Sequence, residues 1–133
     1  MKQILFVEHD KDIRDSVEDY GKSAPHDYQI RIVKTLAEAS DILKREVFNS
    51  VLFDVIHPPM REVLIFIRDA RRRDPYLPML ALVAYSDMIL SDTVKETLRQ
   101  ERVSIVDKLQ ALKDENLSSL FESAVQHGLG EEL

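Results

Sequence analysis

Five short apolar runs alternate along the chain with longer segments of helical periodicity, and this alternation constrains the fold more than any other feature. The runs have strand length, whereas the segments between them carry apolar residues three or four positions apart. Strict alternation of this kind predicts a parallel sheet with helices on both faces and right-handed crossovers. The strands are expected at 4–7, 28–33, 51–53, 79–84 and 103–106, and the helices at 11–23, 35–45, 61–73, 91–100 and 114–127.

The predicted fold class is α/β, a five-fold (βα) doubly wound parallel sheet of strand order 2-1-3-4-5. The run 28–33 alternates apolar and polar residues, which predicts a strand at the sheet edge. Thr35 and Glu38 form a capping-box pattern at the start of the second helix. A chain of 133 residues suits a single domain, and we expect that domain at residues 1–127, followed by a short C-terminal tail at 128–133.

Charge and composition exclude several classes of function. The chain has 18 Lys and Arg against 24 Asp and Glu, a net charge of −6, and this disfavours nucleic acid as a ligand because phosphate backbones need a concentrated positive face. No apolar run approaches the roughly 20 residues that span a bilayer. The chain has no cysteine, so it offers no disulfide and no thiol nucleophile. We therefore expect a cytoplasmic protein that binds neither membrane nor nucleic acid.

Acidic residues follow two strands that are neighbours in the predicted order. Glu8 and Asp10 come after the first strand, and Asp54 comes after the third. Because the carboxyl ends of parallel strands meet at one edge of the sheet, these carboxylates should converge there. Clustered carboxylates repel one another, and the repulsion is relieved by protonating one of them or by a bound cation such as Mg²⁺. The same acids would repel phosphate, which disfavours a nucleotide or flavin site.

These acidic residues belong to a wider pattern that is found in a known family. Three parts of the chain have the order and spacing found in a receiver domain. They are the segment 4–10 (ILFVEHD), the segment 51–55 (VLFDV) followed by Pro58 and Met60, and Lys108 after the fifth strand. The chain resembles the receiver domain of the response regulators of two-component signalling over residues 2 to about 127.

The resemblance implies a role for each matching residue. Asp54 would be the phosphoacceptor, which attacks a phosphohistidine on a partner sensor histidine kinase, and Lys108 would clamp the phosphoryl group. Glu8, Asp10, Asp54 and the backbone carbonyl of Ile56 would hold the Mg²⁺ that offsets the phosphoryl charge. Self-phosphorylation of Asp54 would be the only catalysis, so we expect no enzyme in the ordinary sense. A homodimer through the face of the fourth helix, fifth strand and fifth helix is also expected.

Several positions depart from the family pattern. His9 stands where the direct Mg²⁺ ligand is usually an Asp, and imidazole is a poor ligand for so hard a cation, so we expect Mg²⁺ to bind weakly. Val83 stands where a Thr or Ser hydroxyl would meet the phosphoryl group, and Ile105 replaces the aromatic residue whose rotamer follows that hydroxyl. Arg102 stands at a position usually held by glycine. The sequence thus predicts a degenerate phosphoryl switch, as in a pseudo-receiver.

Three of these residues also have a plainer interpretation. Asp10 is expected chiefly as the N-cap of the first helix. The imidazolium of His9 could lie between Glu8 and Asp54 and take the place of the metal charge. Lys108 is expected to form an ion pair with Asp54 whether or not phosphate is bound.

Three other features bear on metal binding, on a helix end and on partner contacts. His9, His57 and Asp54 could form a two-histidine-one-carboxylate set for Zn²⁺, Ni²⁺ or Fe²⁺, as in a metal-dependent hydrolase. The run 71–73 of three arginines is expected as a solvated turn at a helix end. Residues 88–90 (Met-Ile-Leu) could be loop residues folded under the fourth helix or an exposed apolar patch for partners or dimers.

The leading hypothesis is a receiver-like signalling module of a two-component phosphorelay that acts by protein–protein interaction with a degenerate phosphoryl switch. The first alternative is a functional response regulator, phosphorylated on Asp54 by a histidine kinase with Mg²⁺. The second alternative is the metal-dependent hydrolase on the same fold.

Overall fold

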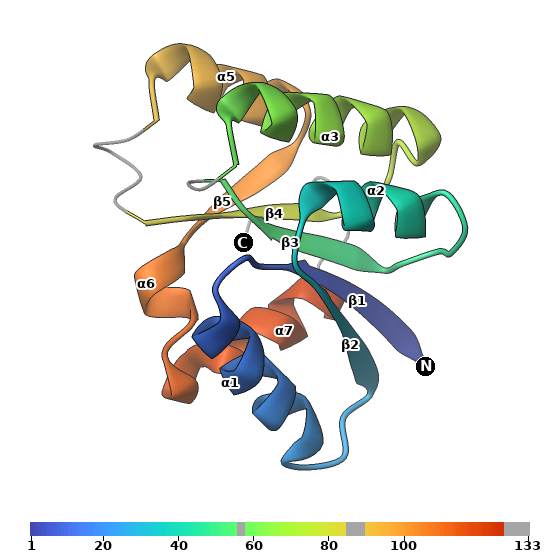
Figure 1. The fold of residues 1–133 in the computed structure, drawn as a ribbon, viewed down its shortest axis with the longest axis vertical. Coiled ribbons are helices and arrows are strands. Elements are labelled where there is room, and N and C mark those ends of the chain that lie inside the picture. The colour runs from blue at the N-terminus through green and yellow to red at the C-terminus, as the bar shows by residue number, and fades with distance from the viewer. Residues whose placement is uncertain (56–57, 85–89, 127–133) are drawn as a thin grey trace.

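The computed structural model describes residues 1–55, 58–84 and 90–126, and it has the predicted alternation of strands and helices (Figure 1). The strands are β1 (Lys2–Val7), β2 (Tyr28–Val33), β3 (Ser50–Asp54), β4 (Met79–Val83) and β5 (Val103–Asp107). The helices are α1 (Lys11–Lys22), α2 (Leu36–Leu43), α3 (Met60–Arg73), α5 (Asp92–Gln100), α6 (Lys108–Ala111) and α7 (Leu117–Gln126), with a 3₁₀ turn, η1, at Asp114–Asn116.

All five strands form one parallel sheet in the order β2-β1-β3-β4-β5, which confirms the predicted fold class. The alternating strand β2 lies at an edge, as expected. In the central pairs, Val7 lies beside Phe53 and Asp54 lies beside Leu82. The carboxyl ends of β1 and β3 are therefore neighbours.

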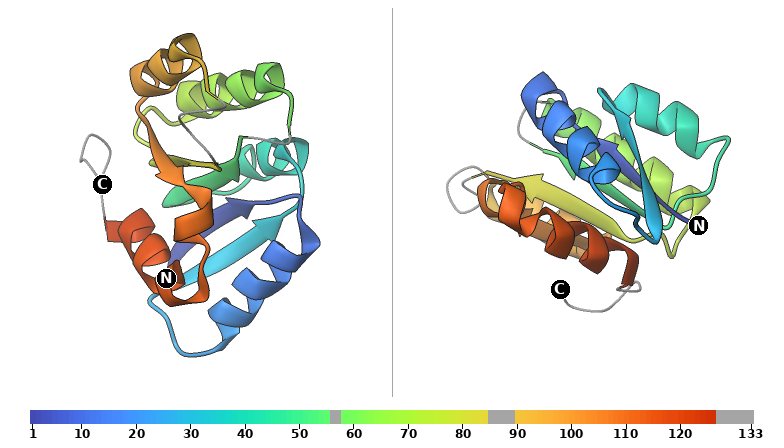
Figure 2. Two further views of the ribbon diagram at one scale, coloured as in Figure 1. Left: turned by 90° about the vertical axis from the view of Figure 1, so that its left-hand side faces the viewer. Right: turned by 90° about the horizontal axis from the view of Figure 1, so that it is seen from below.

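Helices cover both faces of the sheet (Figures 1 and 2), and the sheet separates two apolar clusters. On one face, α2, α3 and α5 pack on side chains such as Leu5, Phe53 and Val83. On the other, α1 and α7 pack on Ile4, Phe6 and their neighbours. The central strand β3 is buried along its whole length, as expected for a strand covered on both sides.

Local capping agrees with the sequence. The Thr35 side chain accepts the amide hydrogen of Glu38, and the Ser91 side chain accepts that of Val94. Asp10 caps α1, as discussed below.

Two details of the helices differ from the sequence prediction. The last predicted helix begins with η1 and becomes α-helical only at Leu117. The short helix α6 was not predicted, because four residues are too few to carry a helical period. Asp107 caps α6 by accepting the amide hydrogen of Leu109.

The prediction for the arginine run was wrong at its first residue. Arg71 is buried on the inner face of α3, whereas the next two arginines are exposed, as expected. The guanidinium of Arg71 donates to backbone carbonyl oxygens of Asp74, Pro75, Leu77, Glu101 and Arg102. It fastens the end of α3 to the turn before β5, so it is a structural cation rather than a solvated one.

The structure describes one residue of the apolar run 88–90. Leu90 is buried against the core, so the exposed-patch alternative is wrong for that residue. Met88 and Ile89 lie outside the described residues, as do Ile56, His57 and the expected tail at 128–133. Within the part of the chain that the structure describes, no helix is long and apolar enough to cross a membrane.

Candidate functional site

The carboxyl edge of the sheet gathers the charged residues expected there. Glu8 follows β1, Asp54 ends β3 and Lys108 follows β5. All three side chains are buried, and Glu8 has no exposed surface at all. Burial of this kind is rare for charged groups unless they are paired, so the interactions among them decide what the site can do.

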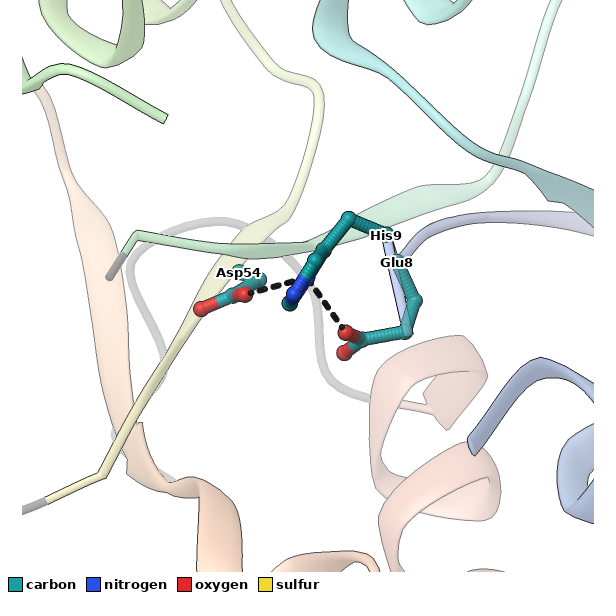
Figure 3. Close-up of side chains that lie close together, drawn as sticks. All are labelled: Glu8, His9 and Asp54. Atoms are coloured by element: carbon teal, nitrogen blue, oxygen red, sulfur yellow. Dashed lines mark ion pairs between the residues drawn. The ribbon is translucent and has the colours of Figure 1, made fainter. Parts of the chain in front are cut away.

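His9 lies between the two carboxylates (Figure 3). Its Nδ1 atom is 3.1 Å from Glu8 Oε2 and 3.4 Å from Asp54 Oδ2. A ring nitrogen stabilises two carboxylate oxygens only when it carries a proton, so we assign the proton of His9 to Nδ1. The ring nitrogen thus lies between Glu8 and Asp54, where one interpretation of the sequence places it.

Lys108 closes the cluster from the other side. Its Nζ atom lies 2.9 Å from Glu8 Oε1 and 3.2 Å from Asp54 Oδ2. The predicted ion pair between Lys108 and Asp54 is therefore confirmed, and the same ammonium also neutralises Glu8. Two buried carboxylates thus face two nitrogen donors from their own chain, which offsets the repulsion that would otherwise call for a bound cation.

Asp10 does not join this cluster. Its side chain accepts the amide hydrogens of Asp12 and Ile13 at the start of α1, so the N-cap interpretation is confirmed. The amide of Ile13, followed by that of Asp12, lowers the pKa of Asp10 below its ordinary value. The carboxylate of Asp10 thus faces the backbone of α1, and Asp10 is outside the group formed by Glu8, His9 and Asp54.

The loop that carries His9 is held by bonds that the sequence analysis missed. The Arg14 guanidinium donates to the carbonyl oxygens of Glu8 and His9, at 3.1 and 2.6 Å. The backbone amide of Asp10 donates to Glu8 Oε2 at 3.1 Å. A cation one turn into the helix that follows an acidic loop was the available signal for Arg14.

The residues present do not fit Mg²⁺ well. Among the residues that the structure describes, Glu8, His9 and Asp54 are the group that could hold a metal, and their ligand atoms lie within 4.8 Å of one another. Mg²⁺ requires an octahedral shell of oxygens, and this group supplies two carboxylates and one ring nitrogen. Asp10 is engaged elsewhere, and the backbone carbonyl of Ile56 lies outside the described residues.

The two positions at which the resemblance to receiver domains expects a switch contain no hydroxyl and no aromatic ring. Val83 ends β4 and is fully buried, and Ile105 lies on the neighbouring strand β5 with 40% of its surface exposed. A valine at the end of β4 offers no hydrogen bond to an anion at Asp54.

A cavity of about 340 Å³ opens beside the cluster. His9 and Asp54 line one side of it, and Thr35, Leu36 and Glu62 are among the residues of the other walls. The His9 side chain is 41% exposed, so solvent and small ions reach the cluster from this side.

Comparison with known proteins supports the fold. No protein-family model matches the chain, and no curated protein matches it in sequence. Solved structures do match. They include an adenylate cyclase from Rhodopirellula baltica (TM-score 0.73, 19% identity, 94% of this chain and 87% of that chain). They also include the chemotaxis protein CheY4 of Vibrio cholerae (0.72, 20%, 93% and 98%).

A third match is a CheY-like response regulator receiver domain protein from Methanospirillum hungatei JF-1, with TM-score 0.65 and 21% identity, covering 96% of this chain and 99% of that chain. With the strand order and the helices on both faces, these matches show that the chain has the fold of response regulator receiver domains. The resemblance inferred from the sequence is confirmed at the level of the fold.

Proposed function

We propose that this chain is a two-component signalling module that works by binding a protein partner, with its acidic pocket neutralised by its own His9 and Lys108. The partner is a sensor histidine kinase or another signalling protein. The observation that carries the proposal is the position of His9 Nδ1, within 3.4 Å of both Glu8 and Asp54. A proton donor at this point occupies the space between the carboxylates that a dication would take.

The chemistry at Asp54 argues against efficient phosphoryl transfer. A phosphoryl group that reached Asp54 would bring further negative charge beside the buried Glu8. Lys108 is the cation available to receive it, and that ammonium already contacts Glu8 and Asp54. Val83 would leave one phosphoryl oxygen without a hydroxyl donor, so a phosphorylated state would be poorly stabilised and poorly signalled.

The surface at the β5 edge suits a protein partner. Ile105 on β5 and Leu109 on α6 are both at least 40% exposed, and large apolar side chains on a receiver-like face are candidates for contact. Ile105 lines a groove of about 380 Å³, together with Leu80, Val106 and Leu120 among others. We assign partner or homodimer binding to this face.

Acetyl phosphate labelling tests the proposal. The protein is incubated with acetyl phosphate and Mg²⁺, and phosphoryl addition is read by intact mass. Wild type should label no more than Asp54→Asn, because both lack a usable acceptor site. The double variant His9→Asp/Val83→Thr, which supplies the missing ligand and hydroxyl, should gain Mg²⁺-dependent labelling. Mg²⁺-dependent labelling of the wild type, absent in Asp54→Asn, would support the functional response regulator instead.

A further inference from the structure

The strand β2 forms one edge of the sheet, and among the described residues no strand lies on its outer side (Figure 1). It pairs with β1 in an unbroken register, from Lys2 beside Tyr28 to Val7 beside Val33, so no bulge interrupts the edge. Proteins commonly protect such an edge with proline, lysine or a bulge, because its free backbone groups can pair with another chain. The sequence of β2, YQIRIV, contains neither proline nor lysine.

Every second residue of β2 turns its backbone groups away from the sheet. The carbonyl oxygen of Val33 accepts the amide hydrogen of Glu8, so the backbone of Val33 faces β1. In a parallel strand, successive residues bond to opposite sides. The residues whose amides and carbonyls face outward, and to which no described residue bonds there, are therefore Tyr28, Ile30 and Ile32.

A cavity of about 750 Å³ lies beside this row of backbone groups. Ile30 and Ile32 line it from the face of the sheet that α1 covers, and Gln29 and Arg31 line it from the opposite face. Because side chains of both faces line the cavity, it lies along the edge of β2. Gly21 of α1 is also in its wall, with open space around the position that a Cβ would take. The free side of β2 thus has room for a further strand.

The residues of β2 match those of a second copy of the same strand. When two copies run antiparallel about a two-fold axis at Ile30, Ile30 meets Ile30, and Tyr28 meets Ile32 of the second copy. These are the residues with outward backbone groups, so each pair can exchange hydrogen bonds. Their side chains form aromatic and β-branched cross-strand pairs, which stabilise antiparallel sheets.

The charges on the other face select the same register. With the axis at Ile30, Gln29 meets Arg31 of the second copy, and no like charges lie opposite each other. An axis at Arg31 would instead place two guanidinium groups side by side. Within its own chain, Arg31 lies 3.2 Å from Glu46, which neutralises the one charge on the strand.

We propose that the free edge of β2 binds β2 of a second copy of this chain, antiparallel about Ile30, so that the two sheets join into one. The second copy is the occupant because both faces of the strand are self-complementary in this register. The face of Ile105 lies at the opposite edge of the sheet and stays free for the partner assigned to it above. The acidic pocket takes no part in the dimer, so labelling of Asp54 and dimerisation can each fail alone.

Variants of Gln29 test the register, because this exposed residue meets Arg31 on both sides of the axis. Sedimentation velocity over a concentration series gives the dissociation constant of the dimer. Gln29→Glu places a carboxylate opposite each Arg31 and should tighten the dimer about threefold or more. Gln29→Arg should weaken it by a similar factor. Since added negative charge on an acidic chain opposes other modes of association, tightening by Gln29→Glu is specific to this register.

Ile30→Lys tests the position of the axis. It places two ammonium groups opposite each other and should weaken the dimer at least about tenfold. A lysine can extend to solvent from this half-buried position, and circular dichroism checks the fold. The matched control is Ile65→Lys, at an exposed isoleucine of α3, which should leave the dissociation constant unchanged. A dimer that Ile105→Lys abolishes and Ile30→Lys does not would lie at β5 and overturn the inference.

Amide hydrogen exchange reads the strand pairing directly. The amides of Ile30 and Ile32 should become protected as the protein concentration rises, whereas those of Gln29 and Arg31 are protected at every concentration by β1. A dimer without added protection at Ile30 would contradict the proposal. A wild-type protein that stays monomeric up to about 1 mM would also overturn it, since a strand of another protein would then be the occupant of the edge.

Discussion

The two ends of the sheet each bury a cation, and the two cations are satisfied in different ways. At the amino end of β4 and β5, Arg71 donates to five neutral carbonyl oxygens. At the carboxyl end, Lys108 lies between the charged side chains of Glu8 and Asp54. The guanidinium of Arg71 is held by hydrogen bonds to neutral groups, whereas the ammonium of Lys108 is held by ion pairs with opposite charges.

The difference separates a structural cation from a functional one. Burial lowers the pKa of Arg71, but a guanidinium stays charged at any ordinary pH and its acceptors cannot ionise. The acceptors of Lys108 are carboxylates, and the net charge of their site changes when a cation binds, when a carboxylate is protonated or when Asp54 is phosphorylated. Variants at the amino end should therefore change stability alone, and variants at the carboxyl end should change stability and ligand binding together.

The largest effect is expected from Arg71→Met. Five carbonyl groups lose their charged donor, so the free energy of unfolding should fall by about 4 kcal/mol. Urea denaturation measures it. The exposed neighbour gives the control, and Arg72→Met should change stability by less than about 0.5 kcal/mol. A small effect of Arg71→Met would show that water replaces the guanidinium at little cost.

Lys108→Met should come next. It removes the ammonium that contacts both Glu8 and Asp54, and we expect a loss of about 3 kcal/mol in the free energy of unfolding. Adding Asp54→Asn removes one of the opposed charges and should recover about 1 to 2 kcal/mol of that loss. A double-mutant cycle by urea denaturation gives the coupling, and strictly additive effects would contradict the ion cluster. Lys11→Met, at an exposed position, is the control.

Tyr28→Phe tests how the stability of the amino end of the sheet depends on pH. The Tyr28 and Tyr20 hydroxyl groups are 2.6 Å apart, and burial, followed by that hydrogen bond, raises the pKa of Tyr28. Because the pKa of Tyr28 is raised in the folded state, its contribution to the free energy of unfolding is complete below the pKa of the unfolded chain, near 10. That contribution is lost as the pH rises through the pKa of the folded state.

Stability measured from pH 9 to 12 should therefore fall more steeply in wild type than in Tyr28→Phe. At neutral pH the variant should lose about 1 kcal/mol with the hydrogen bond. Parallel curves for the two proteins above pH 10 would show that Tyr28 ionises as freely as in the unfolded chain.

The smallest effect is expected at Arg102, which has a φ of 60° in the left-handed region. Arg102→Gly removes that strain but also a side-chain bond to the Pro75 carbonyl, so stability should rise by about 0.5 kcal/mol. Glu101→Gly, at an ordinary negative φ, should lower it by a similar amount. Thermal denaturation distinguishes the two signs, and a loss in Arg102→Gly would contradict the assigned strain.

Sequence reasoning predicted what depends on periodicity and topology. The apolar spacing predicted the strands and helices, and the strand order predicted that Glu8 and Asp54 meet. The place of Lys108 beside them came from the resemblance to receiver domains. Sequence reasoning could not predict which carboxylate would turn to the backbone, although capping favoured that for Asp10. It also treated three consecutive arginines as alike, although Arg71 stands four residues after Ile67 and so continues the buried face of α3.

The most direct test of the internally neutralised pocket is a Mg²⁺ titration of wild type and His9→Asp, followed in parallel by amide ¹H–¹⁵N spectra. In the wild type, His9 lies between the carboxylates of Glu8 and Asp54. We therefore expect the wild-type protein to bind Mg²⁺ at least about tenfold more weakly than His9→Asp does. The amides that shift on binding should lie near Glu8 and Asp54. Equal affinities for the two proteins, with the same amides shifting, would contradict the account.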